Sequence, residues 1–193
     1  MKREKIRIEH IALLLLIMAL TILLIKPFLP DYVVEEDIRN YVIEDAAVKY
    51  PQAEVIEVVS MDKKYSSKGD YYEVKVRVSW GLQTKCPSRI HLYYNYPEQN
   101  FVPQPPEVIT ERCQLCIAEH CSILFPEEAI IASHKLYPTA EISSYIDSYQ
   151  AMPEVIFRDG KWYVTWTSRK GDSSICVIVE KNGSSYKSTS SNC

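Results

Sequence analysis

The stretch Tyr72-Glu73-Val74-Lys75-Val76-Arg77-Val78-Ser79-Trp80 decides the fold class of this chain. Its charged residues Glu73, Lys75 and Arg77 alternate with valines, and successive side chains of a strand point to opposite faces of a sheet. A strand with one apolar and one charged face is typical of an antiparallel sheet that covers a core on one side only. The stretch therefore predicts a half-buried antiparallel strand.

The segments on either side complete a unit of one helix and three strands. We expect a helix from Glu35 to about Lys49, because acidic residues fill its first turn and its apolar residues follow a rough helical spacing. Two further strands are expected at Glu54–Ser60 and Arg89–Tyr96. Since the apolar face of such a sheet must be covered, the helix is expected to pack on it and form an α+β module.

A second copy of the unit is expected after residue 125. Pro126, Glu127 and Glu128 mark the start of a helix that ends near Lys135. The strands expected after it are Glu141–Ser148, Lys161–Thr167, entered through an Asp159-Gly160 hairpin turn, and Ile175–Glu180. The outer part of the chain is thus predicted to hold two tandem helix-plus-antiparallel-sheet modules.

The two copies also share a short motif, in which Tyr50-Pro51-Gln52-Ala53-Glu54 matches Tyr137-Pro138-Thr139-Ala140-Glu141. By this motif and the order of elements, the chain resembles membrane-anchored proteins with two PepSY-like or cystatin-like modules, over residues 35–96 and 126–187. The resemblance implies a non-enzymatic module that binds or modulates partners at the cell surface. It carries over no catalytic residue.

Chemistry can concentrate in the segment between the copies, which is rich in proline and cysteine. The six cysteines of the chain are Cys86, Cys113, Cys116, Cys121, Cys176 and Cys193. An even number of cysteines suggests disulfides, and we expect them to staple this connector to the modules. Cys86 and Cys176 occupy comparable points of the two copies, so each could pair with a cysteine of the connector.

Two other interpretations of these cysteines stay open. Cys113, Cys116, His120 and Cys121 could bind zinc, with Cys86 replacing one of them, because thiolate and imidazole ligands suit a tetrahedral zinc ion. Alternatively, Cys113 and Cys116 could form the exchanging pair of a thiol–disulfide oxidoreductase. His91 and His134 are expected to be ordinary sheet or surface histidines, and Trp80, Trp162 and Trp166 to lie in or near the core.

The N-terminal stretch Met1 to Pro30 favours a membrane anchor. Lys2, Arg3, Lys5 and Arg7 precede the apolar run Ile11–Ile25, which only Thr21 interrupts. By the positive-inside rule, the N-terminus is expected in the cytoplasm and residues 31–193 outside, as in a single-pass signal-anchor protein. A cleaved secretory signal and a buried helix are the alternatives.

The charge of the outer part disfavours a nucleic-acid partner. Residues 31–193 hold 17 Lys and Arg against 23 Asp and Glu, a net charge of −6. Asn182-Gly183-Ser184 is a glycosylation sequon, although a tight turn explains the same residues. No Ser-centred nucleophile elbow, phosphate-binding glycine loop or H-E-x-x-H motif is present in the sequence.

Together these patterns predict a disulfide-stapled, non-enzymatic binding or accessory protein with no cofactor, anchored in the lipid bilayer through Ile11–Ile25 and bound to a protein of the cell envelope. The rival classes are a membrane-tethered thiol–disulfide oxidoreductase and a structural zinc-binding module. The expected division is residues 1–30 for the leader and anchor, 31–96 for the first module, 97–125 for the connector and 126–193 for the second module with its polar tail.

Overall fold

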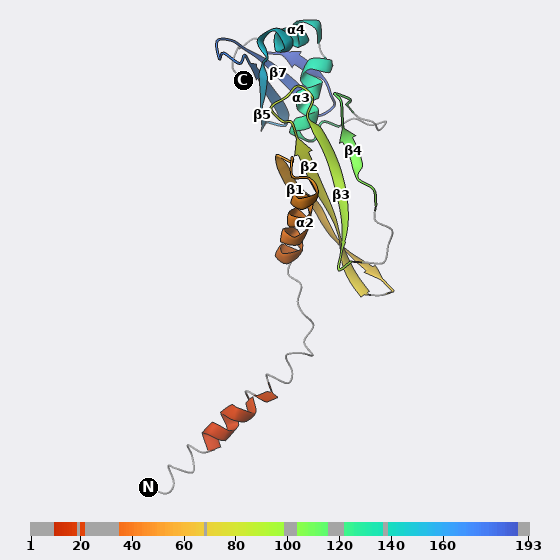
Figure 1. Ribbon diagram of the computed structural model, residues 1–193, viewed down its shortest axis with the longest axis vertical. Coiled ribbons are helices and arrows are strands. Elements are labelled where there is room, and N and C mark those ends of the chain that lie inside the picture. Colours follow the sequence, from red (N-terminus) through yellow and green to blue (C-terminus); the bar gives the residue numbers. More distant parts are fainter. Residues whose placement is uncertain are drawn as a thin grey trace, which may run out of the picture. The chain divides into compact units, whose positions relative to one another are not determined.

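The computed structural model describes residues 10–18, 20–21, 35–67, 69–98, 104–115, 122–136 and 139–188. The chain divides into two compact units, Met1–Asp37 and Ile38–Cys193. Both sheets in the described part of the chain belong to the second unit (Figure 1).

The described residues of the N-terminal apolar run are helical at positions 10–18 and 20–21, and their apolar side chains are exposed. No helix in the described part of the chain is both long and apolar enough to cross a membrane. A helix of fifteen residues reaches only about 22 Å, which is short of a hydrocarbon core of about 30 Å. The predictions of a transmembrane helix at Ile11–Ile25 and of a single-pass membrane location with residues 31–193 outside are therefore corrected.

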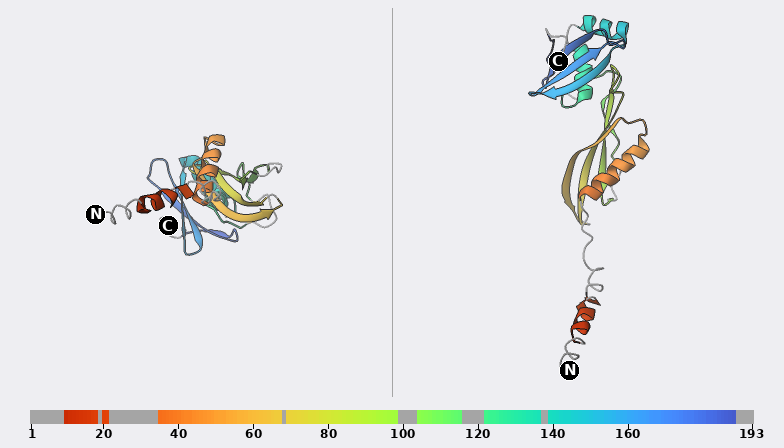
Figure 2. Two further views of the ribbon diagram at one scale, coloured as in Figure 1. Left: turned by 90° about the horizontal axis from the view of Figure 1, so that it is seen from below. Right: turned by 90° about the vertical axis from the view of Figure 1, so that its left-hand side faces the viewer.

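The first sheet is an antiparallel meander. Its strands are β1 (Val55–Ser66), β2 (Gly69–Trp80), β3 (Ser88–Tyr96) and β4 (Glu107–Thr110), and their order in the sheet is β1-β2-β3-β4. Helix α2 (Glu35–Lys49) lies along one face of this sheet (Figure 2). The fourth strand comes from the proline-rich connector and pairs with β3.

The core of this half forms where α2 meets β2 and β3. The helix contributes Ile38, Val42 and Ala46, which are spaced four residues apart and so lie on one helical face. The valines of β2 face them, as their alternation with charged residues predicted. The buried residues of this cluster are Ile38, Val42, Ala46, Val74, Val76, Val78, Ile90 and Leu92.

The second sheet has the same sequential strand order. Its strands are β5 (Met152–Arg158), β6 (Lys161–Thr167), β7 (Ser174–Glu180) and β8 (Ser185–Lys187), in the order β5-β6-β7-β8. Two helices precede them, α3 (Pro126–Lys135) and α4 (Thr139–Tyr149). Trp166 is fully buried among residues of α3, α4 and the sheet, whereas Trp162 is only partly buried.

The strand predicted at Glu141–Ser148 is wrong, because these residues belong to α4. Ile142 and Ile146, four residues apart, are both buried against the second core, which is a helical rather than a strand spacing. The Asp159-Gly160 hairpin turn is confirmed. Both residues have positive φ, at 52° and 77°, as a tight turn between antiparallel strands requires.

The α+β class is confirmed, with two four-stranded antiparallel sheets that share one strand order. The helices that pack on the sheets differ between the halves, since α2 packs on the first sheet and both α3 and α4 contribute to the core of the second. The shared Tyr-Pro-x-Ala-Glu motif leads into a strand in the first copy and into a helix in the second.

Candidate functional site

A buried ion cluster joins the two halves of the second unit. It consists of Arg77 and Arg89 from the first sheet and Glu127 and Glu128 from the first turn of α3. Glu127 Oε1 accepts hydrogen bonds from Arg77 Nη2 at 2.6 Å and from Nε at 3.2 Å, and Glu128 Oε1 accepts one from Arg89 Nη2 at 2.5 Å. Glu127 is fully buried and Arg77 is 6% exposed.

Phe125, the residue before α3, packs against this cluster. Both guanidinium groups lie over the ring of Phe125, with Cζ at 4.8 Å (Arg77) and 4.3 Å (Arg89) from the ring centroid. Glu128 also accepts hydrogen bonds from the backbone N–H groups of Leu124 and Phe125, and so caps the helix. Arg77 was expected on a solvated face, but α3 and Phe125 cover that face at this end of the sheet.

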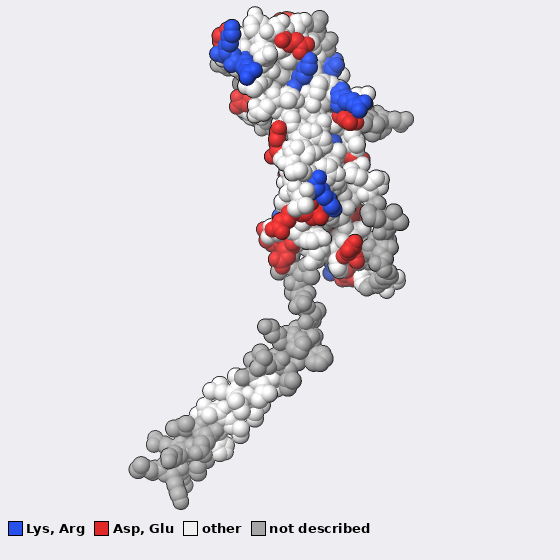
Figure 3. Space-filling view, viewed as in Figure 1, with Lys and Arg blue, Asp and Glu red and all other residues white. Residues whose placement is uncertain are grey.

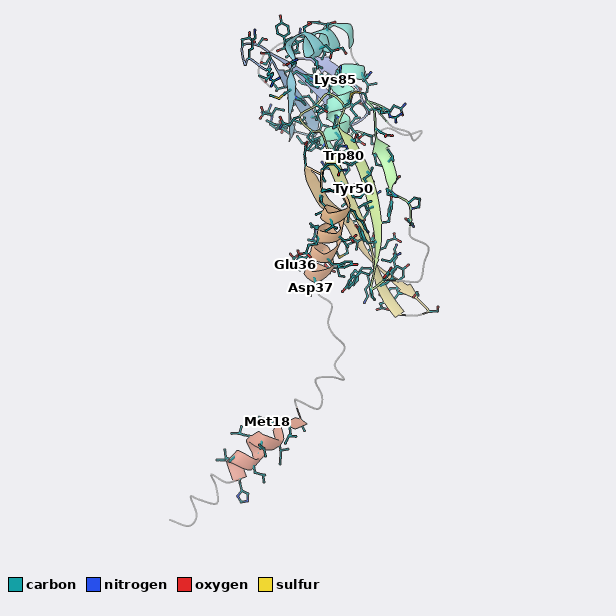
Figure 4. The ribbon with its side chains drawn as sticks, in the orientation of Figure 1. Met18, Glu36, Asp37, Tyr50, Trp80 and Lys85 are labelled. Atoms are coloured by element: carbon teal, nitrogen blue, oxygen red, sulfur yellow. A yellow bond between two sulfur atoms is a disulfide. The ribbon has the colours of Figure 1, made fainter. Side chains whose placement is uncertain are left out.

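A disulfide joins Cys86 and Cys113. Cys86 follows Lys85, which is labelled in Figure 4, in the loop after β2. Cys113 follows β4, so the bridge links two segments of the first half. The disulfide expected between a module cysteine and a connector cysteine is therefore present. Cys113 is bonded to Cys86, and not to Cys116.

His134, on the last turn of α3, faces this disulfide. Its Nε2 lies 3.7 Å from Cys113 Sγ, and the ring is almost fully buried, perpendicular to the ring of Trp166. Nδ1 lies 3.0 Å from the carbonyl oxygen of Ile130, which can only accept, so Nδ1 carries the proton. Burial, followed by the nearby Lys135 and Lys85, lowers the pKa of His134, and the neutral ring directs an unprotonated Nε2 towards the sulfur.

The other predicted site residues are only partly covered by the structure. Cys176 lies in β7, is buried and is disulfide-bonded. Asn182 is exposed in the turn after β7, where its Oδ1 accepts hydrogen bonds from the N–H and the hydroxyl of Ser184. The remaining predicted ligands and disulfide cysteines, Cys116, His120, Cys121 and Cys193, lie outside the described residues.

A groove of about 530 Å³ opens on the first half between α2 and β3. Five tyrosines line it, and we call it the tyrosine groove. They are Tyr41, Tyr50, Tyr93, Tyr94 and Tyr96. The rings of Tyr41 and Tyr96 lie 5.4 Å apart, and that of Tyr50 stacks on Trp80 at 6.5 Å, beside the end of α2 (Figure 4).

The charges along the tyrosine groove are mostly negative. Asp45, Glu73 and Glu98 line it, and Lys49, the one cation among the described lining residues, pairs with Asp45 at 2.6 Å. Lys49 Nζ also lies 5.3 Å from the ring centroid of Tyr94. Burial, with Asp45 nearby, raises the pKa of Tyr94, and its buried hydroxyl makes no well-formed hydrogen bond to any described residue.

Neither the contact of His134 with the disulfide nor the tyrosine groove is predicted by the sequence. The run Tyr93-Tyr94-Asn95-Tyr96 could have indicated the groove. It places tyrosines on both faces of a strand, whereas a core covers only one face. His134 gave no such signal, since the folding of α3 against the loop of Cys86 brings it to the cysteines.

A search against protein-family models, curated proteins and solved structures found no match to this chain.

Proposed function

We propose that this chain is a non-enzymatic accessory protein that binds a segment of a partner protein in the tyrosine groove. The groove itself carries this proposal, because it combines concave shape, aromatic lining and a surplus of carboxylates. Tyrosine gives large contact area at little conformational cost, and it is enriched where proteins bind one another. The resemblance to PepSY-like and cystatin-like modules, which rests on the order of elements, supports the same class of function.

The partner segment is expected to carry Lys or Arg side chains. Carboxylates outnumber cations along the groove, and Figure 3 shows further Asp and Glu side chains over α2, whose first turn holds Glu35, Glu36 and Asp37. Tyrosine rings also attract cations, as Lys75 shows by lying 5.4 Å from the ring centroid of Tyr93. An acidic groove disfavours a nucleic-acid partner.

Short labelled peptides test the proposal directly. One peptide carries alternating Arg and apolar residues, and two matched peptides replace every Arg with Gln or with Glu. We expect only the Arg peptide to bind, as measured by fluorescence anisotropy, with an affinity that falls as salt is added. Equal binding of the Glu peptide would contradict the proposal.

A pair of tyrosine variants locates the binding. Tyr41 lines the groove and is half exposed, so Tyr41→Ala leaves the core intact. We expect this change to weaken binding of the Arg peptide at least about fivefold, since buried tyrosines at interfaces contribute 1 kcal/mol or more. Tyr65→Ala is the matched control, because Tyr65 is exposed near the far end of β1 and does not line the groove.

The rival function is a thiol–disulfide oxidoreductase that uses Cys113 and Cys116. The contact between Cys113 Sγ and His134 Nε2 favours it, because a neighbouring imidazole can accept the proton of a thiol. Catalytic reduction of a disulfide substrate that is lost in Cys113→Ser but kept in Tyr41→Ala would establish this rival. Absence of such turnover, together with peptide binding, would favour the accessory protein.

A further inference from the structure

The disulfide and the neighbouring His134 support an inference that goes beyond partner binding. Cys86, Cys113 and His134 place one ligand atom each within 4.8 Å of one another. Two thiolates and one imidazole are the ligand set of a zinc site, but the sulfurs are bonded to each other in this structure. The arrangement therefore holds a metal only after the disulfide is reduced.

We propose that reduction of the Cys86–Cys113 disulfide converts this cluster into a three-ligand zinc site, with His134 as the third ligand. This set differs from the one that the sequence suggested, since it keeps Cys113 and the alternative ligand Cys86 but takes His134 in place of His120. Three protein ligands leave one coordination position of a tetrahedral ion open.

The distance between sulfur and imidazole already suits such an ion. With bonds of about 2.3 Å to sulfur and about 2.0 Å to nitrogen, a tetrahedral zinc holds these two ligand atoms roughly 3.6 Å apart. Cys113 Sγ and His134 Nε2 lie 3.7 Å apart. The two sulfurs must separate to roughly 3.8 Å by the same geometry, and both lie in loops outside the strands.

The surroundings of His134 also match those of a metal ligand. A histidine that binds a metal through one nitrogen usually donates the other N–H to a carbonyl or carboxylate. Here Nδ1–H donates to the Ile130 carbonyl oxygen, which fixes the tautomer and leaves Nε2 for the ion. Trp166, at 5.7 Å and perpendicular to the imidazole, packs against the ring and shields it from water.

The redox step balances with a thiol reductant as the co-reactant. Two molecules of a monothiol supply two electrons, so that the Cys86–Cys113 bond breaks, a disulfide forms between the two reductant molecules, and each cysteine takes up one proton. Binding of Zn²⁺ then forms two Zn–S bonds and one Zn–N bond and releases these two protons.

Cobalt gives the proposal a direct readout, because tetrahedral thiolate-bound Co²⁺ absorbs visible light and Zn²⁺ displaces it. The full chain is reduced anaerobically with a phosphine, which adds no thiol, and titrated with Co²⁺ and then with Zn²⁺. We expect the reduced protein to bind Co²⁺ with a thiolate-to-cobalt band, and the oxidised protein to show no such band. A band of equal strength in the oxidised protein would overturn the proposal.

Two variants separate this cluster from the other cysteines. Cys86→Ser combined with Cys113→Ser keeps the four remaining cysteines, and we expect it to lose the tight cobalt site. His134→Gln is expected to weaken binding at least tenfold, whereas His91→Gln, which changes a second buried histidine, leaves it unchanged. Binding in the double variant as tight as in the wild type would place the site elsewhere and end the proposal.

A measurement on the wild type covers the case in which His134→Gln does not fold. Zinc should slow the alkylation of Cys86 and Cys113 in the reduced protein at least tenfold, as followed by mass spectrometry of their peptides. Alkylation of both at the same rate with and without zinc would contradict the inference.

Discussion

At the scale of single residues, the side chain of His91 makes the stability of the first half depend on pH. It is 5% exposed in β3, with Lys75, Arg89 and Glu107 around it. Burial lowers its pKa to about 4, and Lys75 and Arg89 act in the same direction against Glu107. The folded protein therefore keeps this imidazole neutral at a pH at which the unfolded chain has already protonated it.

The free energy of unfolding is expected to fall as the pH drops from about 6.5 towards 4. The unfolded chain takes up the proton first, so the stabilisation present above pH 6.5 is lost over this window, by roughly 3 kcal/mol in total. Urea unfolding of the wild type and of His91→Gln at pH 7 and pH 4.5 measures it. The variant should lose about 2 kcal/mol less than the wild type between these two pH values. An identical loss in both proteins would exclude His91 as the cause.

The burial of a residue could be predicted from the sequence only where the periodicity of its own helix or strand determines which face it occupies. The valines of β2 follow from their alternation, because the strand period alone sets their face. Arg77 obeys the same alternation and is nevertheless buried, since α3, fifty positions later, covers it. No pattern in the sequence around Arg77 indicates that so distant a segment covers its side chain.

At the scale of the elements, the start of α3 depends on charges that come from β2 and β3. Arg77→Met removes one partner and leaves the fully buried Glu127 with Arg89, at 3.8 Å, as its remaining ion-pair partner among the described residues. Loss of one member of a buried pair commonly costs about 3 to 5 kcal/mol, and we expect about 3 kcal/mol here in the free energy of unfolding.

The corresponding double change should restore most of that loss. Arg77→Met with Glu127→Leu removes both charges, and apolar replacements of a buried pair are often neutral. Glu57→Gln is the matched control, because Glu57 also pairs with Arg77 at 2.8 Å but its side chain is 56% exposed, so its removal should cost less than about 1 kcal/mol. Chemical denaturation measures all three. A double variant that is less stable than Arg77→Met would refute this account.

The helices and strands show where the periodicity of the sequence was sufficient to predict secondary structure. The helix of residues 35–49 and the strands after it agree with their patterns, since propensity and packing favour the same state there. Helix α4 was mistaken for a strand because the motif shared with the first copy outweighed the helical spacing of Ile142 and Ile146. Strand β4 lies in a proline-rich segment, where the sequence gives little sign that the chain returns to pair with β3.

At the scale of the whole molecule, the disulfide ties the first sheet to the segment that leads towards α3. Cys86 and Cys113 are 27 positions apart. Closing a loop of this length in the unfolded chain is expected to stabilise the fold by about 3.5 kcal/mol in the chain-entropy model. We therefore expect Cys86→Ala with Cys113→Ala to lower the free energy of unfolding by that amount.

The single variants serve as internal controls for this prediction. Cys86→Ala and Cys113→Ala each abolish the same bond, so each alone should cost nearly as much as the double change. Denaturant unfolding under non-reducing conditions provides the comparison. Two single losses that add up in the double variant would show that the residues act separately and not through one bond.

The arrangement of the two sheets has a consequence for how the chain folds. Every strand of each sheet pairs with its neighbour in sequence, so each sheet is built from contacts within its own half. The ion pairs between Arg77 and Glu127 and between Arg89 and Glu128 span much longer stretches of chain. The first sheet can therefore form during synthesis, before α3 has left the ribosome, and its two buried arginines remain open to water until the second half arrives.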